Sequence, residues 1–188
     1  MDSTSKQGTF AVRSRTRHLG HSSRMRARWF FWRLKHRRSD EKKKAINLAV
    51  NAFQQFAFTD PNTGTMLKYN LYVPKDYDAN RSYPLVLFIH DRGVVSSDTR
   101  RTLVQGHGAV VWATPSEQAK HESFVLAPQY AHGIVNDRFE ATQEVDVTVD
   151  LVRALEGQYS IDGNRLYTTG QSMGCMASIE MLDRKSVV

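Results

Sequence analysis

The chain has 188 residues, of which 40% are apolar and 24% are charged, and its formal net charge is +7. This length and composition are typical of one globular domain, and they exclude collagen-like, low-complexity and wholly disordered proteins. No stretch approaches the roughly 18 apolar residues that a membrane-spanning helix needs. The single cysteine, Cys175, cannot form an internal disulfide or supply a thiolate zinc site.

The positive charge is concentrated in the first 44 residues, which carry 14 Lys and Arg but only 3 Asp and Glu. Such a segment repels itself, so we expect residues 1–44 to be a disordered basic arm. Two other interpretations stay open. The arm could bind nucleic acid or an anionic surface, helped by the aromatic residues Trp29, Phe30, Phe31 and Trp32, or it could be a targeting presequence. The apolar core of a secretory signal is not present, which favours a cytoplasmic chain.

The first elements expected after the arm are two strands of an antiparallel hairpin. Apolar side chains alternate in Phe53–Phe58 and again in Met66–Val73. Between them lies Asp60-Pro61-Asn62-Thr63-Gly64, whose Pro, Asn and Gly favour a tight turn. Three apolar runs follow that are typical of strands buried on both faces. These runs are Pro84–His90, Ser123–Pro128 and Arg165–Thr169.

A helix is predicted between the second and third of these buried strands. Its apolar stripe consists of Ala141, Val145, Thr148, Val152 and Leu155. Asp137, with Glu140 three residues later, predicts the start of the helix, and Gly157 predicts its end. Buried strands that alternate with amphipathic helices predict an α/β domain over residues 45–188. We expect a mostly parallel sheet with the antiparallel hairpin at its edge and helices on both faces.

The strongest chemical signal is Gly170-Gln171-Ser172-Met173-Gly174, a G-x-S-x-G that follows the third strand and precedes a segment able to form a helix. A serine on a sharp strand-to-helix turn is strained, so Gly170 and Gly174 must lack side chains. The turn exposes the Ser172 hydroxyl as a candidate nucleophile, and the helix start directs the Met173 N–H toward a developing oxyanion. The alternative is a structural turn whose serine has no chemical role.

A second oxyanion donor is expected from the loop after the first buried strand, which reads His90-Asp91-Arg92-Gly93. The main-chain N–H of Asp91 or Arg92 is the candidate donor, and Gly93 would allow close approach. A carboxylate near a forming oxyanion opposes it, so the side chain of Asp91 argues against this assignment. A turn that only ends the strand is the alternative.

Together these segments resemble the α/β-hydrolase superfamily, and within it the branch of predicted peptidases, polyhydroxybutyrate depolymerases and feruloyl esterases. The resemblance rests on Tyr69–Pro74, Tyr83–His90, Phe124–Gln129, Ile161–Tyr167 and Gly170–Gly174, which occur in the family's order. It implies hydrolysis of an ester or peptide through an acyl-enzyme on Ser172, without a metal or another cofactor. Asp91 stands where the family usually has glycine, and Cys175 stands where it often has a second glycine.

The acid and the histidine of the catalytic triad follow the serine in this superfamily. Here all seven histidines precede Ser172, and only 16 residues follow it. We therefore expect a C-terminally truncated hydrolase domain with impaired turnover.

Among the earlier histidines, His90 is the first candidate for a substitute base, and packing beneath the oxyanion loop is its other possible role. We expect Cys175 to be buried on the helix. The alternative function is a non-catalytic binding module whose basic arm contacts nucleic acid or an acidic partner.

Overall fold

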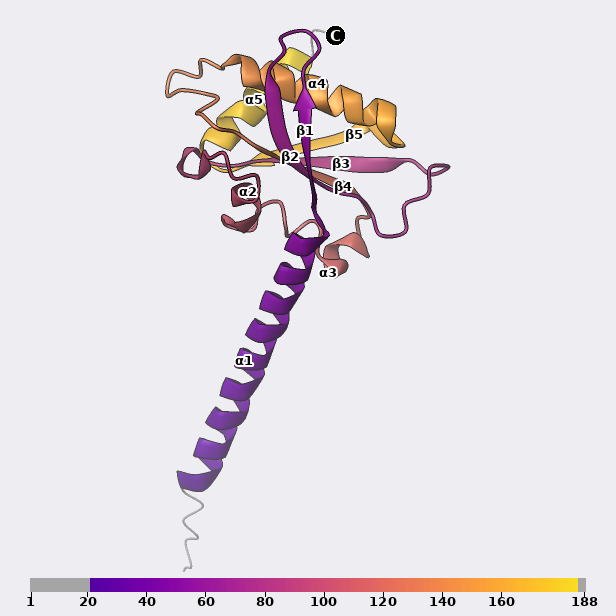
Figure 1. The fold of residues 1–188 in the computed structure, drawn as a ribbon. Coiled ribbons are helices and arrows are strands. Elements are labelled where there is room, and N and C mark those ends of the chain that lie inside the picture. Colours follow the sequence, from indigo (N-terminus) through magenta and orange to yellow (C-terminus); the bar gives the residue numbers. More distant parts are fainter. Residues whose placement is uncertain (1–20, 186–188) are drawn as a thin grey trace, which may run out of the picture. The chain divides into compact units, whose positions relative to one another are not determined.

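The structure is a computed structural model that describes residues 21–185 (Figure 1). The chain divides into two units, residues 1–40 and 41–188, and each is described by itself. Helix α1 (His21–Ala52) occupies much of the segment that was expected to be a disordered arm. Its many Arg, Lys and Ala residues have high helix propensity, which accounts for the difference. Residues 1–20 lie outside the described residues. Every helix within 21–185 is too short or too polar to cross a lipid bilayer.

The second unit is built on a five-stranded mixed sheet with the order β1-β2-β4-β3-β5. Its strands are β1 (Gln54–Thr59), β2 (Met66–Tyr72), β3 (Tyr83–Ile89), β4 (Phe124–Gln129) and β5 (Ile161–Gly170). Strand β3 runs parallel to both β4 and β5, whereas β2 is antiparallel to β1 and β4. The predicted hairpin at the edge of an α/β sheet is therefore confirmed.

Helices cover both faces of this sheet, as predicted. Figure 1 shows α4 (Gln143–Gln158) and α5 (Met173–Lys185) on one side, and the short helices α2 (Arg101–Val104) and α3 (Pro115–Gln118) on the other. Successive side chains of β3 pack on opposite faces of the sheet. Leu85 and Leu87 belong to the core under α4 and α5, whereas Phe88 belongs to the core that contains Leu103 of α2. A strand must be apolar on both sides to do this, which explains the continuous apolar run.

The ends of α4 differ from the prediction. The helix begins at Gln143 after the N-cap residue Thr142, and not near Asp137. Asn136 explains the difference, because its Oδ1 accepts hydrogen bonds from the N–H groups of Arg138 (2.9 Å) and Glu140 (3.1 Å) and forms a separate turn. Gly157 does not end the helix either, since its φ is not positive and the helix continues to Gln158.

The sequence predicted that strand β5 is buried on both faces, and this prediction was wrong. Tyr167 in the middle of the strand is 57% exposed. Among the described strands β5 is an edge strand with β3 as its neighbour, which leaves its second edge unpaired by them. A groove of about 250 Å³ lies beside it, lined by residues of β5, α4 and α5 that include Leu166, Val152 and Met181.

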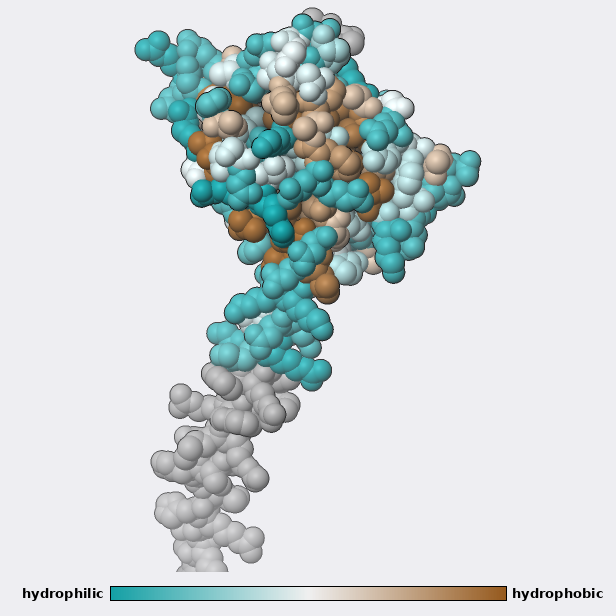
Figure 2. Space-filling view, viewed as in Figure 1, coloured by the Kyte–Doolittle hydropathy of each residue, from teal (hydrophilic) through white to brown (hydrophobic). Residues whose placement is uncertain are grey.

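The opposite edge of the sheet carries a few exposed apolar side chains. Figure 2 shows apolar surface, in brown and tan, over part of the face seen there. Phe56 of β1 stacks on Tyr69 of β2 with ring centroids 5.4 Å apart, and Met66 at the start of β2 is exposed. Isolated exposed side chains of this kind are common on protein surfaces, so we attach no function to them.

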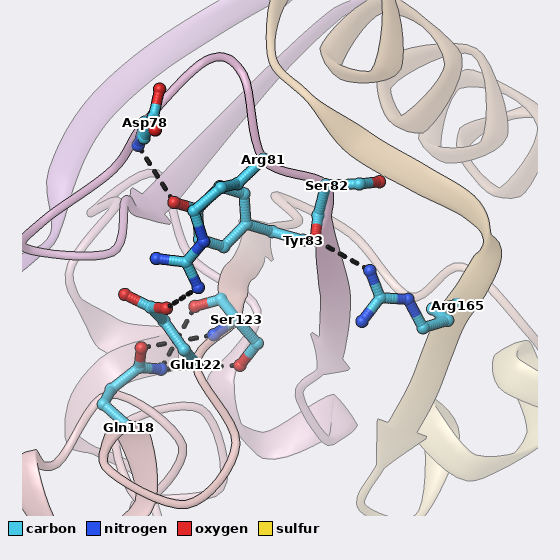
Figure 3. A network of polar contacts seen from close by, with 8 residues as sticks. All are labelled: Asp78, Arg81, Ser82, Tyr83, Gln118, Glu122, Ser123 and Arg165. Atoms are coloured by element: carbon cyan, nitrogen blue, oxygen red, sulfur yellow. Dashed lines mark hydrogen bonds and ion pairs between the residues drawn. The ribbon is translucent and has the colours of Figure 1, made fainter.

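Polar contacts fix the amino-terminal ends of β3 and β5 (Figure 3). Arg165 of β5 donates through Nη2 to the carbonyl oxygen of Ser82 at 2.7 Å. The hydroxyl of Tyr83 accepts a hydrogen bond from the N–H of Asp78 at 2.9 Å. The Arg165 contact joins β5 to the residue before β3, and the ladder between these parallel strands pairs Ile89 with Gly170 at their carboxyl-terminal ends. The candidate site lies at those ends.

Candidate active site

Ser172 lies on a sharp turn between β5 and α5. Its φ is 51°, in the left-handed region that residues other than glycine rarely occupy. The carbonyl oxygen of Ser172 accepts hydrogen bonds from the N–H groups of Cys175 (2.8 Å) and Met176 (3.2 Å), so the serine directly precedes the first turn of the helix. Its side chain is exposed. The strand, the turn and the helix that the sequence motif requires are therefore all present.

Close backbone contacts require the two glycines that flank Ser172. A Cβ at Gly174 would overlap the carbonyl oxygen of Ile89 at the end of β3. A Cβ at Gly170 would overlap the carbonyl group of Gly174 and lie 2.9 Å from the nitrogen of Cys175. Neither glycine has a positive φ, so lack of space and not backbone conformation demands glycine here. Glycine at position 170 thus lets the turn close on itself, and glycine at position 174 lets the turn lie directly against the end of β3.

Met173 is the first residue of α5, so the helix itself offers no acceptor for its N–H group. The helix dipole adds positive potential at the same point. The side chain of Met173 is buried in the core, and its sulfur accepts a hydrogen bond from the N–H of Ile134 at 3.4 Å. The side chain of Met173 thus anchors the start of α5 in the core, while its backbone N–H stays available at the helix start.

The loop after β3 lies against the same helix start. A Cβ at Gly174 would lie only 3.0 Å from the carbonyl oxygen of His90. Asp91, the next residue, is the N-cap of the short 3₁₀ helix η1 (Arg92–Val94), and its Oδ1 accepts a hydrogen bond from the N–H of Gly93 at 2.6 Å. The side chain of Arg92 reaches away to donate to the carbonyl oxygen of Val135 at 2.6 Å. The turn Gly170–Gly174, which we call the elbow, therefore meets the backbone of this loop and not its charged side chains.

His90 is fully buried beneath this loop. Its Nε2 lies 3.1 Å from the N–H of Tyr130, which can only donate, so Nε2 accepts. The proton is then on Nδ1, which donates to the carbonyl oxygen of Asp91 at 2.7 Å. Burial lowers the pKa of His90 below its ordinary value and favours the neutral ring. With both nitrogens occupied, His90 supports the loop and has no nitrogen left for Ser172.

We expect the fold to lose stability as the pH falls below the ordinary histidine pKa of about 6.5. Because the pKa of His90 is lowered in the folded chain, the unfolded chain takes up the proton at a higher pH. Acidification between these two pKa values therefore favours unfolding. Urea midpoints at about pH 7.5 and about pH 5.5 should differ more in the wild type than in His90→Gln. Equal differences in the two proteins would contradict this assignment.

Two glutamines that the sequence analysis did not single out organise this end of the sheet. Gln129, the last residue of β4, accepts a hydrogen bond from the N–H of Thr102 at 2.9 Å and donates to the carbonyl oxygen of Val94 at 2.9 Å. Gln105, which follows α2, donates through Nε2 to the Asp91 carboxylate. A polar residue at the end of an apolar strand is a usable signal for Gln129. Nothing in the sequence marks Gln105.

Cys175 is exposed, and the prediction that it is buried was wrong. Helix α5 packs on the sheet through Met173, Ala177 and Ser178, which are all buried. Ser178 donates to the carbonyl oxygen of Gly174 and contacts the hydroxyl of Thr168, each at 2.8 Å. Cys175 lies two positions after Met173 and therefore faces another direction on the helix.

No protein-family model matches the sequence, and no curated protein matches it. Solved structures do match. A thermostable esterase shares 38% sequence identity with a TM-score of 0.65, over 69% of this chain and 37% of its own. A ferulic acid esterase from the anaerobic fungus Anaeromyces mucronatus shares 22% identity with a TM-score of 0.50, over 69% of this chain and 52% of its own.

The chain has a partial α/β-hydrolase fold. The resemblance to esterases of this fold, which the sequence predicted, is confirmed. The chain spans little more than a third of the thermostable esterase and about half of the fungal enzyme. In this α/β-hydrolase fold Asp91, Arg92, Ser172 and Met173 all follow the carboxyl-terminal ends of the parallel strands β3 and β5.

Proposed function

We propose that this chain is the nucleophile-bearing part of a serine hydrolase that cleaves carboxylic esters through an acyl-enzyme on Ser172. The observation that supports this most is the exposed Ser172 with a φ of 51° at the junction of β5 and α5. Such strain persists only where the surrounding structure imposes it, and it occurs preferentially at functional sites. The 38% identity to an esterase favours an ester over a peptide substrate.

In the proposed reaction Ser172 Oγ attacks the ester carbonyl carbon while its proton passes to a general base. The backbone N–H of Met173 and that of Arg92 or Asp91 stabilise the negative charge on the carbonyl oxygen. Collapse of this intermediate releases the alcohol and leaves the acyl group on Ser172. A water molecule then attacks the acyl-enzyme, so that the carboxylic acid leaves and the serine is restored.

The general base is the part of this mechanism that the described chain does not provide. Within residues 21–185 no hydrogen bond joins a histidine to Ser172, and His90 is committed to the loop. Oxyanion donors alone can still give about 10³-fold catalysis over water. We therefore expect slow turnover of activated esters by this chain and slow but specific modification of Ser172.

Labelling with a fluorophosphonate probe tests the proposed function. The wild-type chain should become labelled on Ser172, and Ser172→Ala should remove the label completely, because the probe forms its bond to Oγ. Ser116→Ala, a change at an exposed serine of α3, is the matched control and should label like the wild type. An unlabelled wild type, or a label that survives in Ser172→Ala, would overturn the proposal.

A further inference from the structure

Asp91 presents a difficulty for the proposed function, on which the following inference rests. A carboxylate beside the position of a developing oxyanion would oppose the charge that the site must stabilise. Yet Asp91 directly follows His90, whose carbonyl oxygen lies against the elbow glycine Gly174. Whether the loop after β3 can serve as an oxyanion donor therefore depends on where the Asp91 carboxylate points and which groups it contacts.

Both oxygens of the carboxylate are occupied. Oδ1 accepts the hydrogen bond from the N–H of Gly93 at 2.6 Å, and Oδ2 accepts the hydrogen bond from Gln105 Nε2. A Cβ at Gly93 would lie 3.0 Å from Asp91 Oδ1, so the absence of a side chain at Gly93 leaves the carboxylate room to fold back on its own loop. The negative charge is thereby tied to the loop by two donors.

Gln105 belongs to a segment that approaches the elbow. It is the C-cap residue of α2, and the next two residues, Gly106 and His107, both have φ of 58°. A Cβ at Gly106 would lie 3.2 Å from Oε1 of Gln171, the residue before Ser172. This segment therefore spans from the Asp91 carboxylate to the elbow. Gln105 Oε1 is buried and accepts no hydrogen bond from residues 21–185, so the amide is oriented through its donor alone.

We propose that Gln105 is a positioning residue that restrains the Asp91 carboxylate, so that the loop after β3 can present a backbone N–H to the oxyanion formed at Ser172. Gln105 acts through Asp91 and does not touch the reacting atoms. The aspartate caps the loop by accepting from Gly93, and the glutamine keeps the charge turned toward that donor. A glycine at position 91 would need no such partner.

The experiment measures the rate of fluorophosphonate labelling in Gln105→Leu, Asp91→Asn and the double variant. Loss of an oxyanion donor slows serine enzymes by roughly a hundredfold. Gln105→Leu releases the Asp91 carboxylate beside the position of the oxyanion, so we expect labelling of this variant to be slowed about tenfold or more. Asp91→Asn removes the charge, while its amide oxygen can still accept from the N–H of Gly93, so its labelling rate is the reference for the double variant. Gln55→Leu, a change at an exposed residue of β1, is the control.

The double variant distinguishes charge from packing. If Gln105 restrains a charge, Asp91→Asn should restore labelling in the Gln105→Leu background to within about twofold of Asp91→Asn alone. A slow double variant, or an unimpaired Gln105→Leu, would overturn the proposal while leaving Ser172 as the nucleophile. If the wild type does not label, the proposed function fails, and hydrogen exchange of the Gly93 amide replaces labelling as the readout. Exchange should then be faster in Gln105→Leu, and unchanged exchange would contradict the restraint.

Discussion

We expect Gly174→Ala to lower the free energy of unfolding by about 3 kcal/mol or more. The new methyl group would overlap the carbonyl oxygen of Ile89 and crowd that of His90. Neither is a flexible side chain, so relief requires that α5 move away from β3. This movement would separate Met173 from the loop after β3, and fluorophosphonate labelling of Ser172 should be lost as well. Urea unfolding and the labelling rate measure the two effects.

Gly157→Ala is the matched control for this change. Gly157 lies near the end of α4, where its φ is not positive and a Cβ would meet nothing within 4 Å. Alanine there should stabilise the helix by about 0.5 kcal/mol, because it reduces the backbone freedom of the unfolded chain. The same substitution thus has opposite effects at the two sites. A Gly174→Ala protein as stable as the wild type would refute the packing of the elbow on β3.

The second large effect is expected for His90→Leu, which should cost about 2–4 kcal/mol of stability. Leucine is close to histidine in size but offers no hydrogen bonds. The N–H of Tyr130 loses its acceptor, and the carbonyl oxygen of Asp91 loses one of its donors. A buried N–H without an acceptor lowers stability, and the loop after β3, which His90 supports, should loosen. Denaturant midpoints should show the loss, with labelling of Ser172 reduced under conditions where the variant is folded.

His121→Leu provides the comparison, because His121 is exposed and its change should alter stability by less than about 0.5 kcal/mol. The pair of variants also separates two roles of His90. A general base that had no structural part would lose activity on substitution without losing stability. An unchanged midpoint in His90→Leu would therefore contradict the supporting role that the hydrogen bonds indicate.

Features that depend on short stretches of sequence were predictable. The alternation in Met66–Val73 and the turn at Gly64 identified the hairpin, and the continuous run Pro84–His90 identified a central strand. The start of α4 was not predictable from a capping pattern, since Asn136 uses the same N–H groups to close a different turn. Competition of this kind between side-chain and helical hydrogen bonds is invisible in a single local pattern.

The sequence by itself determined the five strands and the helices α4 and α5 in their chain order, the place of Ser172 on a strand-to-helix turn and the resemblance to α/β-hydrolases, because each of these follows from spacing within a few residues. The tertiary structure decided the rest. Only the tertiary structure shows that the backbone of β3 leaves no room for a side chain at Gly174 and that His90 supports the loop after β3. It also shows that Gln105 contacts the carboxylate of Asp91 and that Cys175 is exposed. These properties arise from contacts between segments far apart in the chain, which local patterns do not encode.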